Sequence, residues 1–582
     1  MYTPNSAYRI HLSNDINFKR AADAISYLKE LGVEALSVSS PFHSVKINDR
    51  GSATVDPTRL DVELGAETGF AALNSELARS DMHLILDLNP SQMPASHENA
   101  WWFDVLEWGR QSQYAGHFDV DWTKPIALPV LDRPIDQAVQ AGNLQLTFDR
   151  QNASLGISWA DQFYPFAPAS YRAVFQRTKN KTAASLVMAA DNATPDAASD
   201  FHAELLKIFD QADITDQLEI ASWLSDTSHN ADHLIELVSS QHWRLVEVEG
   251  TLDRMDDGHA ANSKLAIGLR IEEPGVFADF HDALLSLLDK TQVKGLRVNE
   301  IDGLADPAEY TRQLRRQAGK ETFLVTDKIL LEGEKYPDDW QVEGTAGYEF
   351  VAAVANLFVD PAGMSKLQDS YQAEFEPNAE LPGQYAHAKA SILHEEFADE
   401  LERLAGLLAE LQPPYAEKLL LRRAIAELVA ELPVYRTYSS SGGYSPFYLG
   451  VLQSTASRVS NRDGQPVDER ETLAFILGIL SSVSDSCNAE SASLFTIRFR
   501  KLTAAVMAQV LQKSYVYTRY PIALDELMLS PTEASNPIAA FHETMRRKAA
   551  AAPSGMLATS FSYATKFGED ARMRLLALSE AP

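Results

Sequence analysis

The chain of 582 residues is long enough for two to four domains, or for one large barrel with insertions. It carries 51 Lys and Arg residues against 81 Asp and Glu residues, and this net charge of −30 disfavours nucleic acid and anionic membranes as partners. A single cysteine, Cys487, excludes an intramolecular disulfide and a CxxC metal site. The N-terminal residues contain no apolar signal-peptide segment and no run of 18 apolar residues predicts a membrane span, so we expect a cytoplasmic protein.

Short apolar strands alternate with amphipathic helical patterns along the chain. The helical pattern KRAADAISYLKELG precedes the predicted strand at 35–40, and TGFAALNSELARS precedes the one at 83–90. Two more strands are predicted at 294–299 and 322–327, each after a helical segment. Such alternation predicts an α/β fold with a buried parallel sheet. Because the strands end in polar residues, we predict a TIM-type (β/α)8 barrel whose working face is its C-terminal rim.

Long insertions separate these barrel elements and suggest five parts. We assign the first barrel strands and helices to residues 1–100, an inserted subdomain to 101–265 and the middle barrel strands to 266–344. A helical insertion follows at 345–435, where ASILHEEFADELERLAGLLAEL is typical of an amphipathic packing helix. The last barrel elements occupy 436–582.

A series of long segments occurs in order along almost the whole chain. They include AYRIHLSNDINF, VDPTRLDVELGAETGF, WWFDVLEWGRQSQYAGHFDVDW, GLRVNEIDGLADP, LFVDP, LPVYRTY and MLATSFSYATKFGED. These segments resemble the maltooligosyltrehalose synthases of glycoside hydrolase family 13, the α-amylase superfamily. The resemblance implies a barrel with insertions, a maltooligosaccharide substrate and neither a metal nor an organic cofactor. It also implies a reaction that turns the reducing-end α-1,4 bond into an α,α-1,1 bond, which gives a trehalose terminus.

The resemblance also locates the three carboxylates of the reaction, and each position differs here. Retaining chemistry needs a nucleophile and an acid/base about 5–5.5 Å apart. The nucleophile position holds Asn299, whose amide cannot form a glycosyl ester, and the acid/base position holds Asp327, one methylene shorter than the family's glutamate. The third carboxylate falls on Ala564, beside Tyr563. Glu300 replaces a histidine, and we expect it to point away from Asn299, because strand neighbours face opposite sides.

Other positions around the predicted site are divided between retained and altered residues. Asp87, Arg297 and Lys328 keep the residue types of the family. Ser91 and Gln92 stand where the resemblance implies Asn and His. No histidine spacing such as HxxxH or HExxH predicts a metal site.

Four residues are candidates for substrate binding. Arg297 and Tyr348 are candidates by position in the matching segments. Trp101 and Trp102 could stack on glucose rings, although a packed core under the rim is the favoured explanation for them.

Together these observations predict a catalytically silent relative of the synthases. We expect it to bind α-1,4-glucan or to serve as a structural or regulatory subunit, linked to trehalose or glycogen metabolism. The alternative stays open that the chain is an active synthase or another α-glucan-processing enzyme, an intramolecular transglycosylase if active, that uses Asp327 with an unidentified second group.

A protein partner is also expected, either another copy of the chain or a different protein. The family continues beyond MLATSFSYATKFGED into an eighth barrel strand and a C-terminal β-domain, and we expect this chain to lack both. A seven-stranded barrel would expose unpaired strand edges, which proteins normally cover.

Overall fold

The fold is described from a computed structural model. It describes residues 2–48, 51–247, 266–331, 334–337, 339–374, 381–415, 417–440, 443–462, 466–481, 489–512, 537–550, 555–556, 559 and 568–581.

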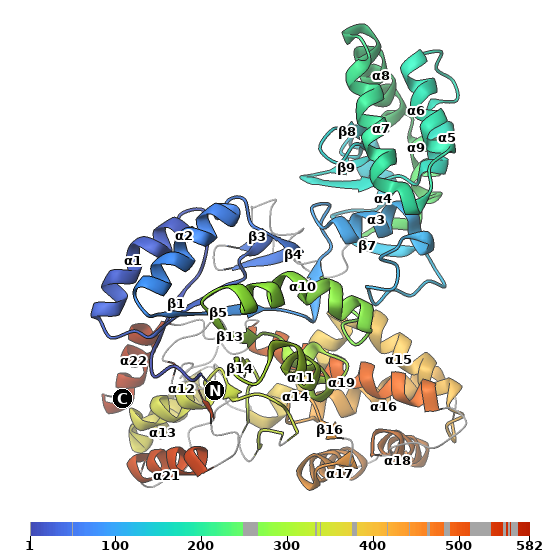
Figure 1. Ribbon diagram of the computed structural model, residues 1–582. Helices are drawn as coiled ribbons and strands as arrows, with labels where there is room; N and C mark the ends of the chain where they lie inside the picture. Colours follow the sequence, from blue (N-terminus) through green and yellow to red (C-terminus); the bar gives the residue numbers. More distant parts are fainter. Residues whose placement is uncertain are drawn as a thin grey trace.

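A seven-stranded sheet, parallel throughout, lies at the centre of the main body (Figure 1). The four strands predicted from the sequence are all present, with ends within two residues of the predicted ones. Apolar side chains bury these strands; for example, every residue of ALSV and of FLVT is buried. In sheet order the strands are β1 (Ala7–Ile10), β2 (Ala35–Val38), β5 (His83–Leu88), β13 (Val293–Val298), β14 (Phe323–Thr326), β15 (Gly344–Thr345) and β18 (Gly555–Met556).

The helices that cross over between these strands are amphipathic and cover the sheet. In α1 (Phe18–Glu30), apolar residues recur every three or four positions and are buried, and Asn17 caps the helix by accepting the backbone N–H of Arg20. The helix α1 packs against α2 (Ala66–Arg79), and the two lie side by side at the left of Figure 1. On the later strands the same function falls to α10 (Pro274–Lys290) and α11 (Pro307–Ala318).

The sheet has two edges, β1 and β18. In the described part of the chain these two strands do not pair with each other. The strand β1 is the exposed edge, since Ala7, Tyr8 and Arg9 are all exposed whereas the residues of β2 are all buried. The described residues therefore show a mixed α/β fold with a partial barrel of seven strands, and the TIM-type barrel that lacks its eighth strand stays a prediction.

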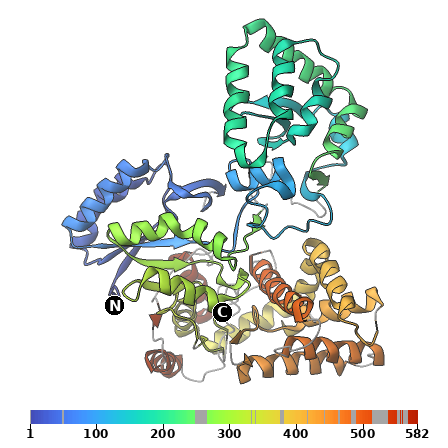
Figure 2. The ribbon, with the colours of Figure 1, turned by 45° about the vertical axis from the view of Figure 1, so that its right-hand side comes forward.

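A second region, inserted after β5, rises away from the sheet (Figures 1 and 2). Its centre combines the parallel pair β7–β11 with the antiparallel sheet β10-β9-β8, and helices pack around both. Its elements are α3 (Ala100–Trp108), β7 (Ile126–Leu131), α4 (Ile135–Gln140), β8 (Gln145–Asp149), β9 (Ser154–Trp159), β10 (Gln162–Pro165), α5 (Tyr171–Phe175), α6 (Lys181–Asp191), α7 (Ala198–Gln211), α8 (Ile214–Ser228), α9 (Ala231–Ser239) and β11 (Trp243–Glu247).

Two small antiparallel pairs lie near the start of this region. They are β3 (Phe42–Asn48) with β4 (Gly51–Leu60), and β6 (Gln92–Pro94) with β12 (Ala266–Gly268).

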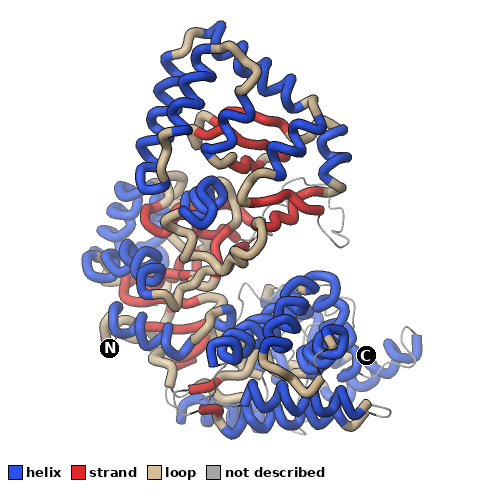
Figure 3. Tube along the Cα trace, turned by 90° about the vertical axis from the view of Figure 1, so that its right-hand side faces the viewer, coloured by secondary structure: helices blue, strands red, loops and turns tan. Residues whose placement is uncertain are grey.

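The last part of the chain is mostly helical and lies below the sheet in Figure 3. Its helices α14 to α19 build a second apolar core of their own. The predicted helix at 390–411 is in fact two helices, because Phe397 leaves the helical conformation between α14 and α15. The helices are α12 (Tyr348–Leu357), α13 (Pro361–Glu374), α14 (Leu381–Glu396), α15 (Ala398–Glu410), α16 (Lys418–Glu431), α17 (Pro446–Ser460), α18 (Val467–Ser481), α19 (Ala489–Gln512), α21 (Pro537–Ala550) and α22 (Glu569–Ala577).

Within the described ranges, none of the helices is both long and apolar enough to cross a membrane. The division of the chain into five parts stays a prediction.

Candidate functional site

Three neighbouring parallel strands bring the predicted site residues to one rim of the sheet. Arg297 of β13 lies in register with Asp87 of β5, and Val298 lies in register with Thr326 of β14. The residues just beyond these strands are therefore level with one another. Asn299 donates its backbone N–H to Leu88 O (2.8 Å), and Asp327 donates its own to Val298 O (3.0 Å). We call the loops after β5, β13 and β14 the strand-end rim.

Asp87 is the centre of an ion-paired group below the rim. Its two carboxylate oxygens accept Nη1 and Nη2 of Arg9, at 3.0 and 2.6 Å, and Oδ2 also accepts Nδ2 of Asn299 at 3.2 Å. Burial opposes the charge of Asp87, but the cations Arg9 and Arg297 outweigh it and hold the pKa of this carboxyl below its usual value. Asn299 thus serves as a hydrogen-bond donor within an internal group.

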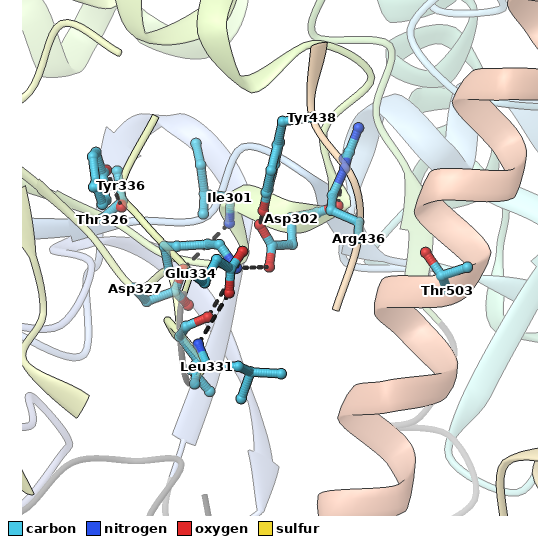
Figure 4. A network of polar contacts seen from close by, with 12 residues as sticks. Ile301, Asp302, Thr326, Asp327, Leu331, Glu334, Tyr336, Arg436, Tyr438 and Thr503 are labelled. Atoms are coloured by element: carbon cyan, nitrogen blue, oxygen red, sulfur yellow. Dashed lines mark hydrogen bonds and ion pairs between the residues drawn. The ribbon is translucent and has the colours of Figure 1, made fainter. Parts of the chain in front are cut away.

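Asp327 directs its carboxylate at backbone N–H groups. Oδ2 accepts the N–H of Glu300 (2.7 Å), and Oδ1 accepts the N–H of Ile301 (3.3 Å), which begins the 3-10 turn η5 (Ile301–Gly303; Figure 4). Burial raises the pKa of Asp327 to about 7, against the lowering effects of the Glu300 N–H and of Arg297. Asp327 therefore acts as the cap of the turn that follows β13, and it titrates near neutral pH.

Glu300 does not follow the strand alternation on which its prediction was based. The strand β13 already ends at Val298, and Glu300 has a left-handed backbone with φ of 53° and ψ of 38°. Its side chain instead reaches the loop after β5, where Oε2 accepts Ser91 Oγ (2.9 Å) and Gln92 Nε2 (2.7 Å). Strand alternation was therefore the wrong reason for the expected orientation of Glu300, although its side chain does have other partners than that of Asn299, which donates to Asp87. Ser91 and Gln92 both bond to Glu300.

Lys328 is buried in a polar network with Asp302 and Glu334, two residues that Figure 4 labels. Its Nζ lies 2.9 Å from Glu334 Oε1 and 3.7 Å from Asp302 Oδ2, and it sits over the ring of Tyr438 at 5.3 Å. Burial would lower the pKa of Lys328, but the charges of Asp302 and Glu334 raise it above its ordinary value. Arg436 completes the network by donating to the carbonyl of Asp302 at 2.6 Å. Lys328 thus fixes the turn after β13 from inside.

The candidate substrate-binding residues are all buried. Arg297 is 7% exposed and lies among Asp87, Asp327 and Tyr348, and it is hydrogen-bonded to the last of these. Tyr348, at the start of α12, is 3% exposed. Both residues belong to the internal packing of the rim.

The two tryptophans lie in the main apolar core. Trp101 is 6% exposed and stacks on Tyr114 with ring centroids 5.6 Å apart, while Trp102 is 1% exposed and meets the edge of Phe118. Both rings are therefore part of the packed core, and stacking on a sugar stays an untested expectation.

Two positions of the predicted site, Tyr563 and Ala564, lie outside the described residues, so the third carboxylate position is not placed. In the part of the chain that is described, no group of three or more His, Cys, Asp or Glu side chains could hold a metal ion.

Comparisons with known proteins place the chain among relatives. No protein-family model matches it. Proteins of two strains of Mycobacterium tuberculosis that carry the name maltooligosyl trehalose synthase are 27% identical over 589 positions, which cover 99% of this chain and 65% of theirs. The solved synthase of Arthrobacter ramosus superposes with a TM-score of 0.74 at 24% identity, over 100% of this chain and 65% of that one. A hypothetical synthase of Sulfolobus tokodaii gives 0.70 at 20%, with 100% and 65% covered.

The chain is similar in sequence and in fold to the maltooligosyl trehalose synthases. It spans about two thirds of their length, 65%, and the resemblance drawn from its sequence is confirmed. Against the three carboxylates that the resemblance implies for a maltooligosyltrehalose synthase, the described rim offers Asn299 and Asp327 in the first two positions, and both are engaged in internal hydrogen bonds.

Proposed function

We propose that the chain is a catalytically silent relative of the maltooligosyl trehalose synthases that binds α-1,4-glucan at the strand-end rim. Asn299 carries the proposal. Its amide can form no glycosyl ester, and its Nδ2 donates to Asp87 Oδ2. The double acceptance of backbone N–H groups by Asp327 agrees with a structural function for that carboxylate. The names of the relatives support α-glucan as the ligand class.

One observation favours a second candidate function, an active α-glucan-processing enzyme with a rearranged site. The pKa of Asp327, raised to about 7 by burial, suits a general acid at neutral pH. Such an enzyme would need a second carboxyl or a bound water for the other half of the reaction.

Binding and turnover can be measured separately on the purified full chain. Calorimetric titration with maltopentaose, with β-1,4-linked cellopentaose as the control ligand, should detect binding of the α-linked sugar alone. Chromatography after long incubation should return maltopentaose unchanged. Conversion of maltopentaose that Asp327→Asn abolishes would refute the hypothesis that the chain is catalytically silent. Failure to bind any α-glucan would refute the hypothesis that α-glucan is its ligand.

A further inference from the structure

A polar cluster of side chains on the strand-end rim lies beside the Asp327 cap and is not part of the Lys328 network. It consists of Glu300, Ser91 and Gln92, which come from two loops more than 200 residues apart in the chain. Glu300 Oε2 accepts Gln92 Nε2 at 2.7 Å, and it shares the hydroxyl of Ser91 with Asn89, since Ser91 Oγ lies 2.9 Å from both Glu300 Oε2 and Asn89 Oδ1. Ser91 is buried, Gln92 is half-buried and Glu300 is exposed, so the cluster runs from the interior to the surface.

The orientation of Glu300 is fixed from its backbone as well as from its side chain. Its N–H is held by Asp327 Oδ2 at 2.7 Å, and its backbone adopts the left-handed region, with φ of 53°. The turn that follows packs closely on the same loop, because a Cβ built on Gly303 would lie 3.0 Å from Ser91 Cβ. Residues other than Gly, Asn and Asp seldom hold such a conformation unless their surroundings fix it. Glu300 is therefore a preorganised group.

The cluster has hydrogen-bonding capacity that the described residues do not use. Both bonds to Glu300 use Oε2, and no described residue donates to Oε1. Likewise, the amide oxygen of Gln92 has no donor within the described ranges, and its Nε2 donates once although it can donate twice. A carboxylate oxygen can accept a hydrogen bond from one hydroxyl of a ligand. An amide group beside it can donate to, or accept from, a second hydroxyl. Neighbouring hydroxyls of a pyranose ring present that pattern.

We propose that Glu300, oriented by Ser91 and Gln92, binds a pair of neighbouring hydroxyls on one glucose unit of an α-1,4-glucan. This inference rests on the proposed function and names the group that holds the ligand at the rim. Glu300 is a binding residue here, and it takes part in no bond-breaking step. The buried residues Arg297, Trp101 and Trp102 have no part in the contact.

The test is calorimetric titration of maltopentaose into the full chain and three variants. Glu300→Ala should weaken binding about 10- to 100-fold, because hydrogen bonds to a charged group are lost, and Gln92→Ala should weaken it about threefold to tenfold. Glu236→Ala is the matched control, since its side chain is 83% exposed on α9 of the inserted region, and it should bind like the wild type.

Glu300→Gln preserves the shape of the side chain and serves if the alanine variant does not fold, as judged by circular dichroism. It should retain the fold and still bind at least about fivefold more weakly, because one charged acceptor is lost. Binding by Glu300→Ala or Glu300→Gln at wild-type affinity would overturn this inference and leave the proposed function intact. A wild-type chain that binds no maltopentaose would overturn both.

Discussion

At the scale of single residues, the strands β5, β13 and β14 stay in register while the side chains at their ends bond to one another. Asn299 lies beside Asp87, where a carboxylate would be a like charge, and its amide donates a hydrogen bond instead. Glu300 shows where reasoning from sequence fails. The alternation rule needs to know where the strand ends, and β13 ends two residues earlier than Glu300.

Changing Asn299 to Asp should not restore synthase activity. The variant replaces a donor beside Asp87 by a second carboxylate, so we expect the free energy of unfolding to fall by about 1–3 kcal/mol at pH 7. Groups that act together in catalysis are strongly non-additive, and one returned carboxylate gains little. Urea denaturation and product chromatography with maltopentaose check the two parts. A trehalose-terminated product from this single variant would contradict the hypothesis that the site has lost its catalytic groups.

The raised pKa of Asp327 predicts that the stability of the fold depends on pH. Its pKa is raised by burial from 3.8 to about 7 in the folded state, so the folded chain holds this proton more tightly than the unfolded chain. The resulting stabilisation is complete below about pH 4 and is lost as the pH rises through about 7. The stability of the wild type relative to Asp327→Asn should therefore decline between pH 5 and pH 8 in urea denaturation. Asp289→Asn, on the surface of α10, is the control and should give a flat difference.

At the scale of elements, the sequence predicted those strands and helices that are long enough to show a pattern of apolar residues. The strands β2, β5, β13 and β14 are apolar runs between helical patterns, and all four were found. The strands β15 and β18 are two residues long, which is too short for any periodicity to appear, and they were missed. The break at Phe397 was missed for a different reason, since the apolar spacing continues across it.

The turn after β13 depends on Arg436, which enters from the segment after α16. This guanidinium is 1% exposed and donates to the carbonyls of Asp302 and Leu304, both at 2.6 Å. Arg436→Met should lower the free energy of unfolding by about 2–4 kcal/mol, because two buried carbonyls lose charged donors. Arg462→Met removes a surface pair with Glu431 and should cost less than about 1 kcal/mol. Equal losses for the two variants would show that the turn does not need Arg436.

At the scale of the whole molecule, one arginine joins two regions that are far apart in the chain. Arg498 of α19 lies 2.5 Å from Asp119, which follows α3, and 2.9 Å from Glu400 of α15. Its side chain is 7% exposed, whereas the two carboxylates are about 30% exposed. The contact ties the start of the inserted region to the helical region.

Arg498→Ala should therefore loosen the attachment of the two regions. We expect the midpoint of thermal unfolding to fall by several degrees, since the loss of about 1–3 kcal/mol shifts a chain of this size measurably. Limited proteolysis should reach the segment around Asp119 sooner than in the wild type. Arg498→Lys, which keeps the charge, should be cleaved at a rate between those of the wild type and Arg498→Ala. If Arg498→Ala resisted proteolysis as well as the wild type, the proposed link between the two regions would be contradicted.

A partner for the exposed edge β1 stays a prediction at this scale. An unpaired parallel edge is normally covered, and the net charge of −30 favours a neutral or basic surface on a different protein. For a homo-oligomer, light scattering at micromolar concentration should give a mass above the 64.3 kDa of one chain. A mass of one chain at all concentrations would exclude self-association, and affinity capture with neutral and basic proteins would then test the second form.

The order of the strands in the sheet also determines when each strand can pair during translation. The strand β5 must pair with β13, yet Asp87 and its register partner Arg297 are separated by the whole inserted region. On the ribosome, β1, β2 and β5 emerge long before β13 exists, and the inserted region, with sheets of its own, is complete in between. Non-local parallel pairing is slow because loop closure precedes the contacts that stabilise it. The edge of β5 that pairs with β13 therefore keeps its backbone N–H and C=O groups without that partner until β13 is synthesised, and such an exposed edge favours aggregation of a nascent chain.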